Sequence, residues 1–401
     1  MSGPAPLAGI KVADFGQFIA APLCGAMLGD MGAEVIRIER PGGSEDRVVT
    51  SFFYRPDGTP GEGPSFLQLN RNKRAISIDL TAPEGAEVIR RVVAWADIVI
   101  ANFPRAVLAK LGLDYESVRA INPRAILVAI TGFGTEGPYA DRVAFDPIAQ
   151  AMTGVTWLSG TEGSPQRTQA TWVDFGTGMM SAYGALAALR TRDQTGEGQL
   201  VSTSLFGTSL NVFAAYLMEQ AVKAPNRVPH GNRGHTAGPV DVFCCTDGSI
   251  FLACQSNPVF RRWARTVGKP ELIDDPRFAD DVSRGIHGKL LGDIMQDWCE
   301  AMTVEETIAK LEAGRVPAAP VLSLQQVLDD PHVTATGAFI DTEFPGIDRP
   351  VPVPKSPLAL SGYQPPAPRR APMIGEDNDA LYAELGFDAE TIADWRARGI
   401  V

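Results

Sequence analysis

The sequence is poor in the residues that build metal centres and disulfide frameworks. Its 401 residues include only four histidines, too dispersed to suggest a metal centre, and five cysteines that form no CxxC pair. An odd number of cysteines without such pairs indicates a reducing compartment with buried thiols. It argues against a disulfide-stapled or zinc-binding protein.

Long apolar runs and excess positive charge are also lacking. No uncharged apolar stretch reaches membrane-spanning length, and the N-terminus has no basic segment followed by an apolar run. The chain has 47 acidic and 36 basic residues, a formal net charge of -11, which argues against nucleic acid or an anionic membrane as partner. A few local arginines and helix N-termini can still bind phosphates. We therefore expect a cytoplasmic protein that acts on small molecules.

Familiar nucleotide-binding and nucleophile motifs are absent or incomplete. The chain has no GxxxxGK[ST] phosphate loop and no GxSxG nucleophile elbow. Gly132, Gly134 and Gly137 match GxGxxG after a strand-like segment. However, Pro138 and Tyr139 follow at the point where a dinucleotide-binding fold needs a helix to begin. We interpret this segment as a tight loop and not as a nicotinamide site.

The first 135 residues alternate strand-like and helix-like patterns. Short apolar segments bounded by turn residues predict strands at 10–15, 34–39, 75–80, 97–103 and 125–133. Helical patterns occupy 20–31, 84–95, 106–111 and 115–121. This alternation predicts an α/β, Rossmann-like domain with a largely parallel sheet and helices on its faces. Such sheets bind ligands at the carboxyl ends of their strands.

The sequence pattern changes twice in the remainder of the chain. A hairpin around the Asp247–Gly248 turn, followed by helical patterns, predicts a smaller α+β domain. Prolines become dense from residue 335, so this tail cannot pair centrally in a sheet and is expected to wrap over the first domain. The predicted plan is a large α/β domain over 1–205, a linker helix over 206–224, a small α+β domain over 225–325, a linker over 326–340, and a return of 341–401 to the large domain.

Asp174 stands out in the segment VDFGTGMMSAYGALAALRTR. Gly176 and Gly178 follow it, and a helix of small and flexible apolar residues then ends at Arg190 and Arg192, where basic side chains favour the helix dipole. A carboxylate just ahead of a helix can stay ionised without a counter-ion, because free backbone N–H groups point at it. Such an aspartate is either an N-cap or a nucleophile, and capping is the common role of Asp at this position.

The motifs along the chain resemble those of the family III CoA-transferases, the group that includes formyl-CoA transferase and carnitine CoA-transferase. The resemblance spans nearly the whole length and depends on the order and spacing of many pieces. They are LAGIKVADFGQFIAAP, LGDMGAEVIRIERPGGSEDR, NRNKRAISIDL, ADIVIANF, LGLDYESVRAINPRAILVAITGFGTEGPY, VDFGTGMMSAYGALAALRTRDQTGEGQLVSTSL, TDGSIFLA, GRVPAAPV, DDPHV and APMIGEDN. No single piece is decisive, but the set is very specific.

The resemblance implies a fold and a mechanism. Family members have two domains per chain, and two ring-like chains interlock into a homodimer. Their catalytic aspartate matches Asp174, whose carboxylate would attack an acyl-CoA thioester to give a mixed anhydride and then an aspartyl-CoA thioester. No metal or redox cofactor is implied beyond coenzyme A as substrate. Gly176 and Gly178 would let the backbone approach the acyl group and expose N–H groups to the developing oxyanion.

The resemblance also implies contacts to CoA. The ADP part of CoA carries several phosphate charges, which suit basic side chains at strand ends. The expected CoA-binding residues are Arg40, Lys73, Arg74, Asn102, Phe103 and Lys110. Phe103 would contact the adenine face or the pantetheine. The alternative for each basic residue is a solvated surface charge.

Departures from the family pattern bear on the substrate. Phe145 stands where the related α-methylacyl-CoA racemases carry a catalytic histidine, and phenylalanine cannot move a proton, although Asp146 beside it could serve. Phe145 and Ile19 also replace a tyrosine and a glutamine that contact the small acid in formyl-CoA transferase. The candidate substrate loop is HGNRGHTAGP at 230–239. We therefore expect a more apolar acid, or a larger dicarboxylate steered by Arg233, and keep a racemase-like enzyme and a non-catalytic CoA-ester binder as alternatives.

Overall fold

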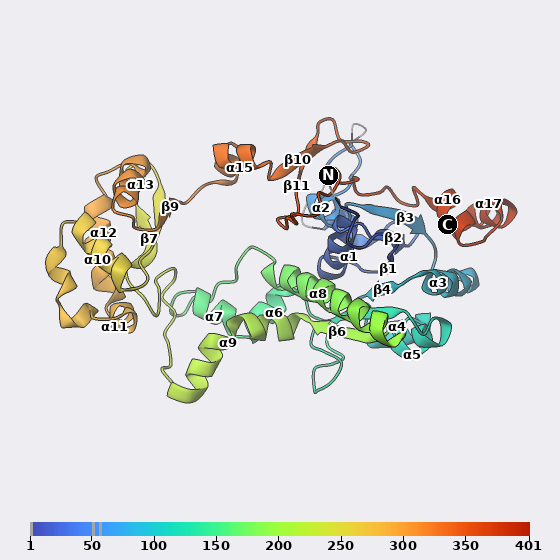
Figure 1. Cartoon of the computed structure of the whole chain (residues 1–401), viewed down its shortest axis with the longest axis horizontal. Coiled ribbons are helices and arrows are strands. Elements are labelled where there is room, and N and C mark those ends of the chain that lie inside the picture. Colours follow the sequence, from blue (N-terminus) through green and yellow to red (C-terminus); the bar gives the residue numbers. More distant parts are fainter. Residues whose placement is uncertain (1–2, 50–52, 56–57) are drawn as a thin grey trace. The chain divides into compact units, whose positions relative to one another are not determined.

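The protein is divided into two compact units (Figure 1). The computed structural model describes residues 3–49, 53–55 and 58–401. The first unit comprises Met1–Thr153, Gln169–Leu217 and Ala335–Val401, and the second comprises Gly154–Thr168 and Met218–Thr334. Each unit is therefore assembled from segments that are distant in the sequence.

A six-stranded parallel sheet forms the centre of the first unit. Its strands are β1 (Lys11–Asp14), β2 (Glu34–Glu39), β3 (Lys73–Ser77), β4 (Ile98–Ala101), β5 (Ile126–Thr131) and β6 (Leu200–Ser204). Their order, β3-β2-β1-β4-β5-β6, is that of a Rossmann fold. The predicted α/β class and parallel sheet are confirmed. Only β6 was missed, because it is an edge strand whose sequence, LVSTS, is short and largely polar.

Helices cover both faces of this sheet (Figure 1). On β1, Val12 belongs to the core beneath α1 and α8, and its neighbour Ala13 belongs to the core beneath α3, α16 and α17. Successive strand residues thus serve opposite faces. The helices of this unit are α1 (Ala20–Asp30), η1 (Glu45–Val48), α2 (Pro64–Leu69), α3 (Pro83–Trp95), α4 (Arg105–Leu111), α5 (Tyr115–Ile121), α6 (Asp146–Met152), α8 (Trp172–Thr195), α16 (Asn378–Glu384), α17 (Ala389–Ala397) and the larger part of α9 (Leu205–Lys223).

The C-terminal segment returns to the free edge of the sheet at β3. The side chain of Asp377 accepts a hydrogen bond from the Ala75 N–H (2.9 Å), and that of Asn378 accepts one from the Ser77 N–H (2.9 Å). These bonds satisfy edge donors that would otherwise be open to another strand. Within the proline-rich tail, β10 (Phe339–Thr342) and β11 (Val351–Pro354) form a two-stranded antiparallel sheet, so its prolines lie in an edge strand.

The second unit is a smaller α+β structure with its own core around Trp263. Its sheet has the order β7-β8-β9 and contains β7 (Val240–Cys244), β8 (Ser249–Ala253) and β9 (Ala318–Pro320). The expected hairpin at Asp247–Gly248 joins β7 to β8, and Thr303 and Glu306 form a capping box on α13. The helices are α7 (Val155–Ser159), α10 (Asn257–Thr266), η2 (Pro270–Ile273), η3 (Pro276–Phe278), α11 (Asp281–Ile286), α12 (Gly288–Cys299), α13 (Val304–Ala313) and α14 (Leu324–Leu328), with α15 (Pro331–Thr336) at its end.

The GxGxxG segment is a loop, as the sequence predicted. It follows β5, and the next helix, α6, begins only at Asp146. Gly134 (φ 98°) and Gly137 (φ 88°) both adopt the left-handed backbone that favours glycine. In the ranges that the structure describes, no helix combines the length and apolar character needed to cross a membrane.

Candidate active site

Asp174 lies in the first turn of α8, inside the helix. The helix begins at Trp172 after Thr171, whose side chain makes no capping hydrogen bond. Another element supplies the cap: Oδ2 of Asp146 accepts hydrogen bonds from the backbone N–H groups of Val173 (2.8 Å) and Asp174 (3.1 Å). The interpretation of Asp174 as an N-cap therefore does not hold, and its carboxylate is left for another role.

The environment of the Asp174 carboxylate raises its pKa. The residue is half-buried, and within the described part of the chain its carboxylate has no hydrogen bond or ion pair. Burial, and after it the negative charge of Asp146, raises the pKa of Asp174 to about 7. A carboxylate with this pKa is partly ionised at neutral pH and is a better nucleophile than an ordinary aspartate. Shifts of this kind are typical of functional sites.

Gly176 and Gly178 lie within α8 and not ahead of it. Inside a helix each N–H bonds to the carbonyl four residues earlier, so the expectation that these two N–H groups face an oxyanion does not hold. Gly178 instead allows α8 to approach the start of α1, since a Cβ there would lie 2.7 Å from the carbonyl oxygen of Ala20. A Cβ at Gly176 would meet only the methyl group of Thr208, at 3.1 Å.

Alanine in place of Gly178 is expected to destabilise the protein, because the atom it would meet belongs to the backbone and cannot rotate away. We expect the free energy of unfolding to fall by about 1–3 kcal/mol, the usual cost of overpacking. CoA transfer would also fall, because α1 and the first turn of α8 would separate. Denaturant unfolding measures the loss, and Gly176→Ala is the matched control with a smaller loss. Equal stability of the two variants would contradict this account of the packing.

Asn102, at the end of β4, fixes the loop that follows β1. Its side-chain oxygen accepts a hydrogen bond from the Gln17 N–H (2.9 Å), and its side-chain amide donates one to the Gln17 carbonyl (2.8 Å). β1 and β4 are neighbours at the point where the strand order reverses, which is where ligands bind in this fold. Asn102 thus fixes the loop 15–19, while Phe103 packs half-buried against one core.

Lys73 is fully buried, and its ammonium group is occupied. Its Nζ donates to Oδ2 of Asp14 (2.7 Å), to the Pro22 carbonyl (2.8 Å) and to Oδ1 of Asn70 (2.9 Å), which uses all three of its N–H donors. Burial lowers the pKa of Lys73 to about 8. The structure therefore gives Lys73 a structural role and does not support its assignment to CoA phosphates.

Arg74 is also engaged by acidic neighbours. Its guanidinium forms ion pairs with Glu34 (3.0 Å) and Glu384 (2.8 Å) and so ties β3 to β2 and to α16. It points to the opposite face from Lys73, as neighbours on a strand do. Binding a phosphate would require Arg74 to give up these partners.

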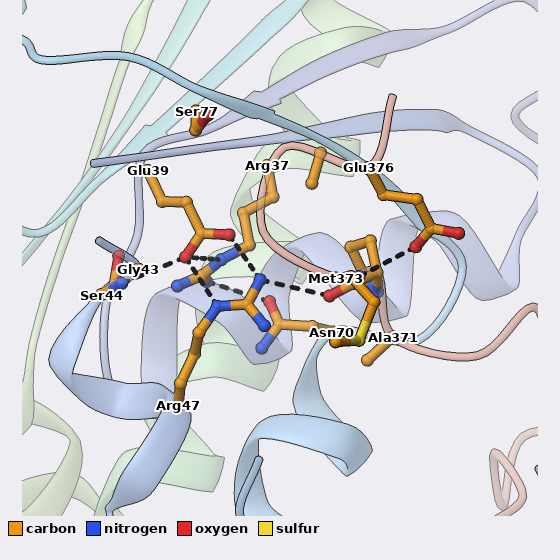
Figure 2. Close-up of polar contacts among 12 residues, drawn as sticks. Arg37, Glu39, Gly43, Ser44, Arg47, Asn70, Ser77, Ala371, Met373 and Glu376 are labelled. Atoms are coloured by element: carbon orange, nitrogen blue, oxygen red, sulfur yellow. Dashed lines mark hydrogen bonds and ion pairs between the residues drawn. The ribbon is translucent and has the colours of Figure 1, made fainter. Parts of the chain in front are cut away.

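The end of β2 carries a buried charge network that leaves Arg40 outside it. Glu39 accepts hydrogen bonds from Arg47, at 3.0 Å and 2.5 Å, and from the Ser44 N–H (3.1 Å). Figure 2 shows the Glu39 carboxylate facing Arg37 and Arg47. A dinucleotide-binding fold uses an acidic residue near this place for the ribose, but Glu39 is only 2% exposed and fully paired. The Arg40 side chain, 60% exposed, donates through Nε to the Gly43 carbonyl and forms a long, exposed ion pair with Glu45 (3.8 Å).

Apolar side chains lie close to the first turn of α8. Phe145, immediately before Asp146, is 49% exposed and contacts Phe18 edge-to-face with the ring centroids 5.3 Å apart. Ile19 is buried, and it packs in a small cluster that includes Phe175, the residue after Asp174. Phe145 thus adjoins Asp146 in the sequence, and Ile19 packs in the cluster that contains the neighbour of Asp174. Both predicted pocket residues therefore lie near the contact between Asp146 and the first turn of α8.

Two other predicted residues belong to other elements. Lys110 is exposed near the end of α4, in the first unit. Arg233 lies in the second unit, where its side chain runs alongside Gly288. The same loop holds His230 and His235 with their ring centroids 3.9 Å apart.

Comparisons with known proteins identify the family. The family model described as "CoA-transferase family III" matches residues 7–378. The chain belongs to CoA-transferase family III. It is 34% identical over 389 residues to a succinate–glutarate CoA-transferase of Agrobacterium fabrum, covering 95% of this chain and 96% of the relative. It is 29% identical over 408 residues to the human succinyl-CoA:glutarate CoA-transferase, covering 100% and 91%.

Solved structures agree with this membership of family III. A CAIB/BAIF family protein from Brucella suis superposes with a TM-score of 0.83 at 33% identity, covering 96% of this chain and all of that one. The protein Rv3272 of Mycobacterium tuberculosis superposes with a TM-score of 0.80 at 28% identity, covering 94% and 99%. The predicted family and enzyme class are therefore confirmed, and the racemase alternative gains no support from the compared relatives, which are named CoA-transferases.

In this family III enzyme, the capping contact from Asp146 could not be predicted from the sequence. The sequence suggested Asp146 only as a substitute proton-transfer group. Its bond to α8 connects residues 27 and 28 positions apart and has no local sequence signal. The one available hint was Pro147, since proline favours the first turn of a helix and so marked the start of α6.

Proposed function

We propose that this protein transfers CoA from succinyl-CoA to a free dicarboxylic acid, with Asp174 as the nucleophile. The observation that carries the proposal is the half-buried Asp174 carboxylate, whose pKa is raised to about 7. Membership of CoA-transferase family III supplies the reaction class. The substrates are inferred from the two compared relatives, because their names pair succinate or succinyl-CoA with glutarate.

The proposed chemistry consists of two linked exchanges. An Asp174 oxygen attacks the thioester carbonyl, the C–S bond breaks, and CoA leaves as the thiolate from a succinyl-aspartyl anhydride. The thiolate then attacks the Asp174 carbonyl and releases succinate, which leaves an aspartyl-CoA thioester. The acceptor carboxylate runs the same sequence in reverse. Protons and electrons balance without a co-reactant, so this mechanism requires no metal or redox cofactor beyond CoA itself.

CoA is proposed to bind at the carboxyl ends of β1 and β4. Asn102 fixes the loop 15–19 there, which supports a binding crevice of defined shape. Arg40 and Lys110 remain the proposed phosphate contacts because both are exposed, and Phe103 remains the proposed contact for adenine or pantetheine. Lys73 is withdrawn from this set because its donors are used internally.

Apolar contacts are proposed for the acid beside Asp174. Phe145 and Ile19 supply apolar surface near Asp174, which suits the methylene groups of a four- or five-carbon dicarboxylate. Arg233, in the second unit, remains a proposed contact for a substrate carboxylate, because an arginine can bind a carboxylate through two parallel hydrogen bonds. Gly176 remains a proposed pocket residue, and a side chain there would approach the methyl group of Thr208.

We further infer a homodimer in the cytoplasm. Met179, Met180, Tyr183 and Leu186 on α8 are 46%, 51%, 67% and 41% exposed. Apolar side chains gathered on one helix are typical of a surface that a partner covers. The five cysteine thiols are all free, which fits a reducing compartment.

A panel of donors and acceptors tests the proposal. Succinyl-, acetyl- and formyl-CoA would be incubated with glutarate, malate, oxalate and a monocarboxylic acid, and the products read by mass spectrometry. We expect transfer from succinyl-CoA to the larger dicarboxylates and little to oxalate, with Asp174→Ala as the inactive control. Folded protein that transfers no CoA, or that only exchanges the α-hydrogen of an acyl-CoA with solvent deuterium, would contradict the proposal.

A further inference from the structure

Asp146 is a buried carboxylate whose hydrogen bonds all come from uncharged donors. It is 1% exposed. Its Oδ2 accepts from the N–H groups of Val173 and Asp174, and its Oδ1 accepts from Nε2 of Gln150 at 2.5 Å. Within the described residues no lysine, arginine or histidine lies within ion-pair distance of it. The negative charge is therefore stabilised by dipoles and not neutralised by a cation.

We propose that Asp146 is a positioning residue for the transfer reaction: it fixes the first turn of α8 and keeps an uncompensated negative charge beside the Asp174 carboxylate. The inference rests on the proposed role of Asp174 as nucleophile. The charge of Asp146 disfavours the ionised form of Asp174 and does not affect its neutral acyl form in the same way. Each acylation of Asp174 removes one of two neighbouring negative charges, so the covalent intermediates gain stability relative to the free carboxylate.

Geometry adds to this electrostatic effect. The same oxygen of Asp146 holds the N–H of Asp174 and the N–H of the residue before it, so the backbone of the nucleophile cannot shift without breaking two hydrogen bonds. Asp146 in turn is held by Gln150 one helical turn later. Because Asp146, a residue of another helix, caps α8, the Asp174 side chain is not used as a cap for its own helix.

Among the described residues, no other charge is placed to replace that of Asp146. Asp174 itself responds to burial and to Asp146 alone. The following ionisable groups of the first unit are already paired: Asp14 with Lys73, Asp30 with Arg71, and Arg192 with Asp97. Farther along α9, Glu219 is paired with Arg227. The remaining ones on α1, α8 and α9 are Cys24, Tyr183, Arg190, Asp193, Tyr216 and Lys223. β5, β6 and α6 contribute none besides Asp146.

The pH profile of the Asp146→Asn variant tests the proposal. Asparagine keeps an oxygen that can accept from the Val173 and Asp174 N–H groups, but it removes the charge. In the wild type kcat/KM should fall as the pH drops through about 7, because Asp174 must be ionised to attack. In Asp146→Asn this acid limb should move to lower pH by about one unit, and kcat should fall about 3- to 10-fold as the nucleophile becomes less basic.

Two further variants separate charge from structure. Asp146→Glu retains the charge, so its acid limb should stay at the wild-type pH even if kcat falls. Asp114→Asn removes the charge of an aspartate that caps α5, and it should leave the acid limb unchanged. An unshifted acid limb in folded Asp146→Asn would overturn the proposal.

The outcome stays informative if Asp146→Asn does not fold. Asp146→Ser then takes its place, because a serine oxygen can accept from the N–H groups of the first turn and carries no charge. An acid limb lowered by about one unit supports the proposal, and an unchanged limb overturns it. The Asp174→Ala variant distinguishes a failure of this proposal from a failure of the proposed function. If that variant is inactive while Asp146→Asn behaves as the wild type, only the role of Asp146 fails. If Asp174→Ala is active, the proposed function fails independently.

Discussion

Replacement of Asp174 by alanine is expected to lower kcat for CoA transfer at least about 1,000-fold, because it removes the atom that forms both covalent intermediates. The KM for succinyl-CoA should change little, since the groups proposed to bind the ADP part lie on other elements. Stability should not suffer, because the carboxylate has no hydrogen bond in the described part of the chain and its burial disfavours the charge. Steady-state assays with succinyl-CoA and glutarate provide the measurement.

The control for this variant lies on the same helix. Asp193 is an exposed aspartate near the C-terminal end of α8, and Asp193→Ala should retain wild-type kcat. Asp174→Asn should be as inactive as Asp174→Ala, since an amide is a poor nucleophile. A folded Asp174→Ala variant within about 10-fold of wild-type activity would contradict the assignment of the nucleophile.

Replacement of Lys73 by methionine is expected to lower the free energy of unfolding of the first unit by about 3–5 kcal/mol, the usual cost of breaking a buried ion pair. Methionine fills a similar volume, so the loss reports charge and hydrogen bonding. Asp14 would remain buried at 0% exposure without its cation, and Asn70 and the Pro22 carbonyl would lose their donor. Denaturant unfolding followed by fluorescence measures the change.

Two controls make the Lys73 result specific. The double variant Asp14→Asn/Lys73→Met should recover part of the loss, because it removes the unpaired charge. Arg90→Met removes an exposed partner of Glu87 on α3 and should leave the unfolding midpoint unchanged. If Lys73→Met instead unfolded like the wild type and raised the KM for CoA esters, Lys73 would belong to the CoA site after all.

The fold was largely predictable because its signals are local. Buried parallel strands are short apolar runs between turn residues, and five of the six strands of the large sheet were found in this way. β6 escaped because an edge strand needs no such run. The start of α8 was placed too late, since Trp172 and Val173 read as part of the preceding segment while the N-terminal cap comes from Asp146.

The sequence predicted where the candidate site residues lie, but not whether their polar groups are free to bind a ligand. The sequence marked Lys73, Arg74 and Asn102 at strand ends, yet it could not show that Asp14, Glu384 and Gln17 already occupy their polar groups. Whether a cation is free depends on acids that are 59 and 310 residues away in the sequence. The same limit hid the contact between Asp146 and the first turn of α8.

The most direct test of the central claim is to capture CoA on Asp174. Protein incubated with succinyl-CoA and then quenched and digested should yield a peptide containing Asp174 that carries the mass of CoA, and hydroxylamine should convert it to the hydroxamate. Asp174→Ala should yield neither product. A labelled aspartate elsewhere in the chain, or full turnover with position 174 never modified, would contradict the mechanism.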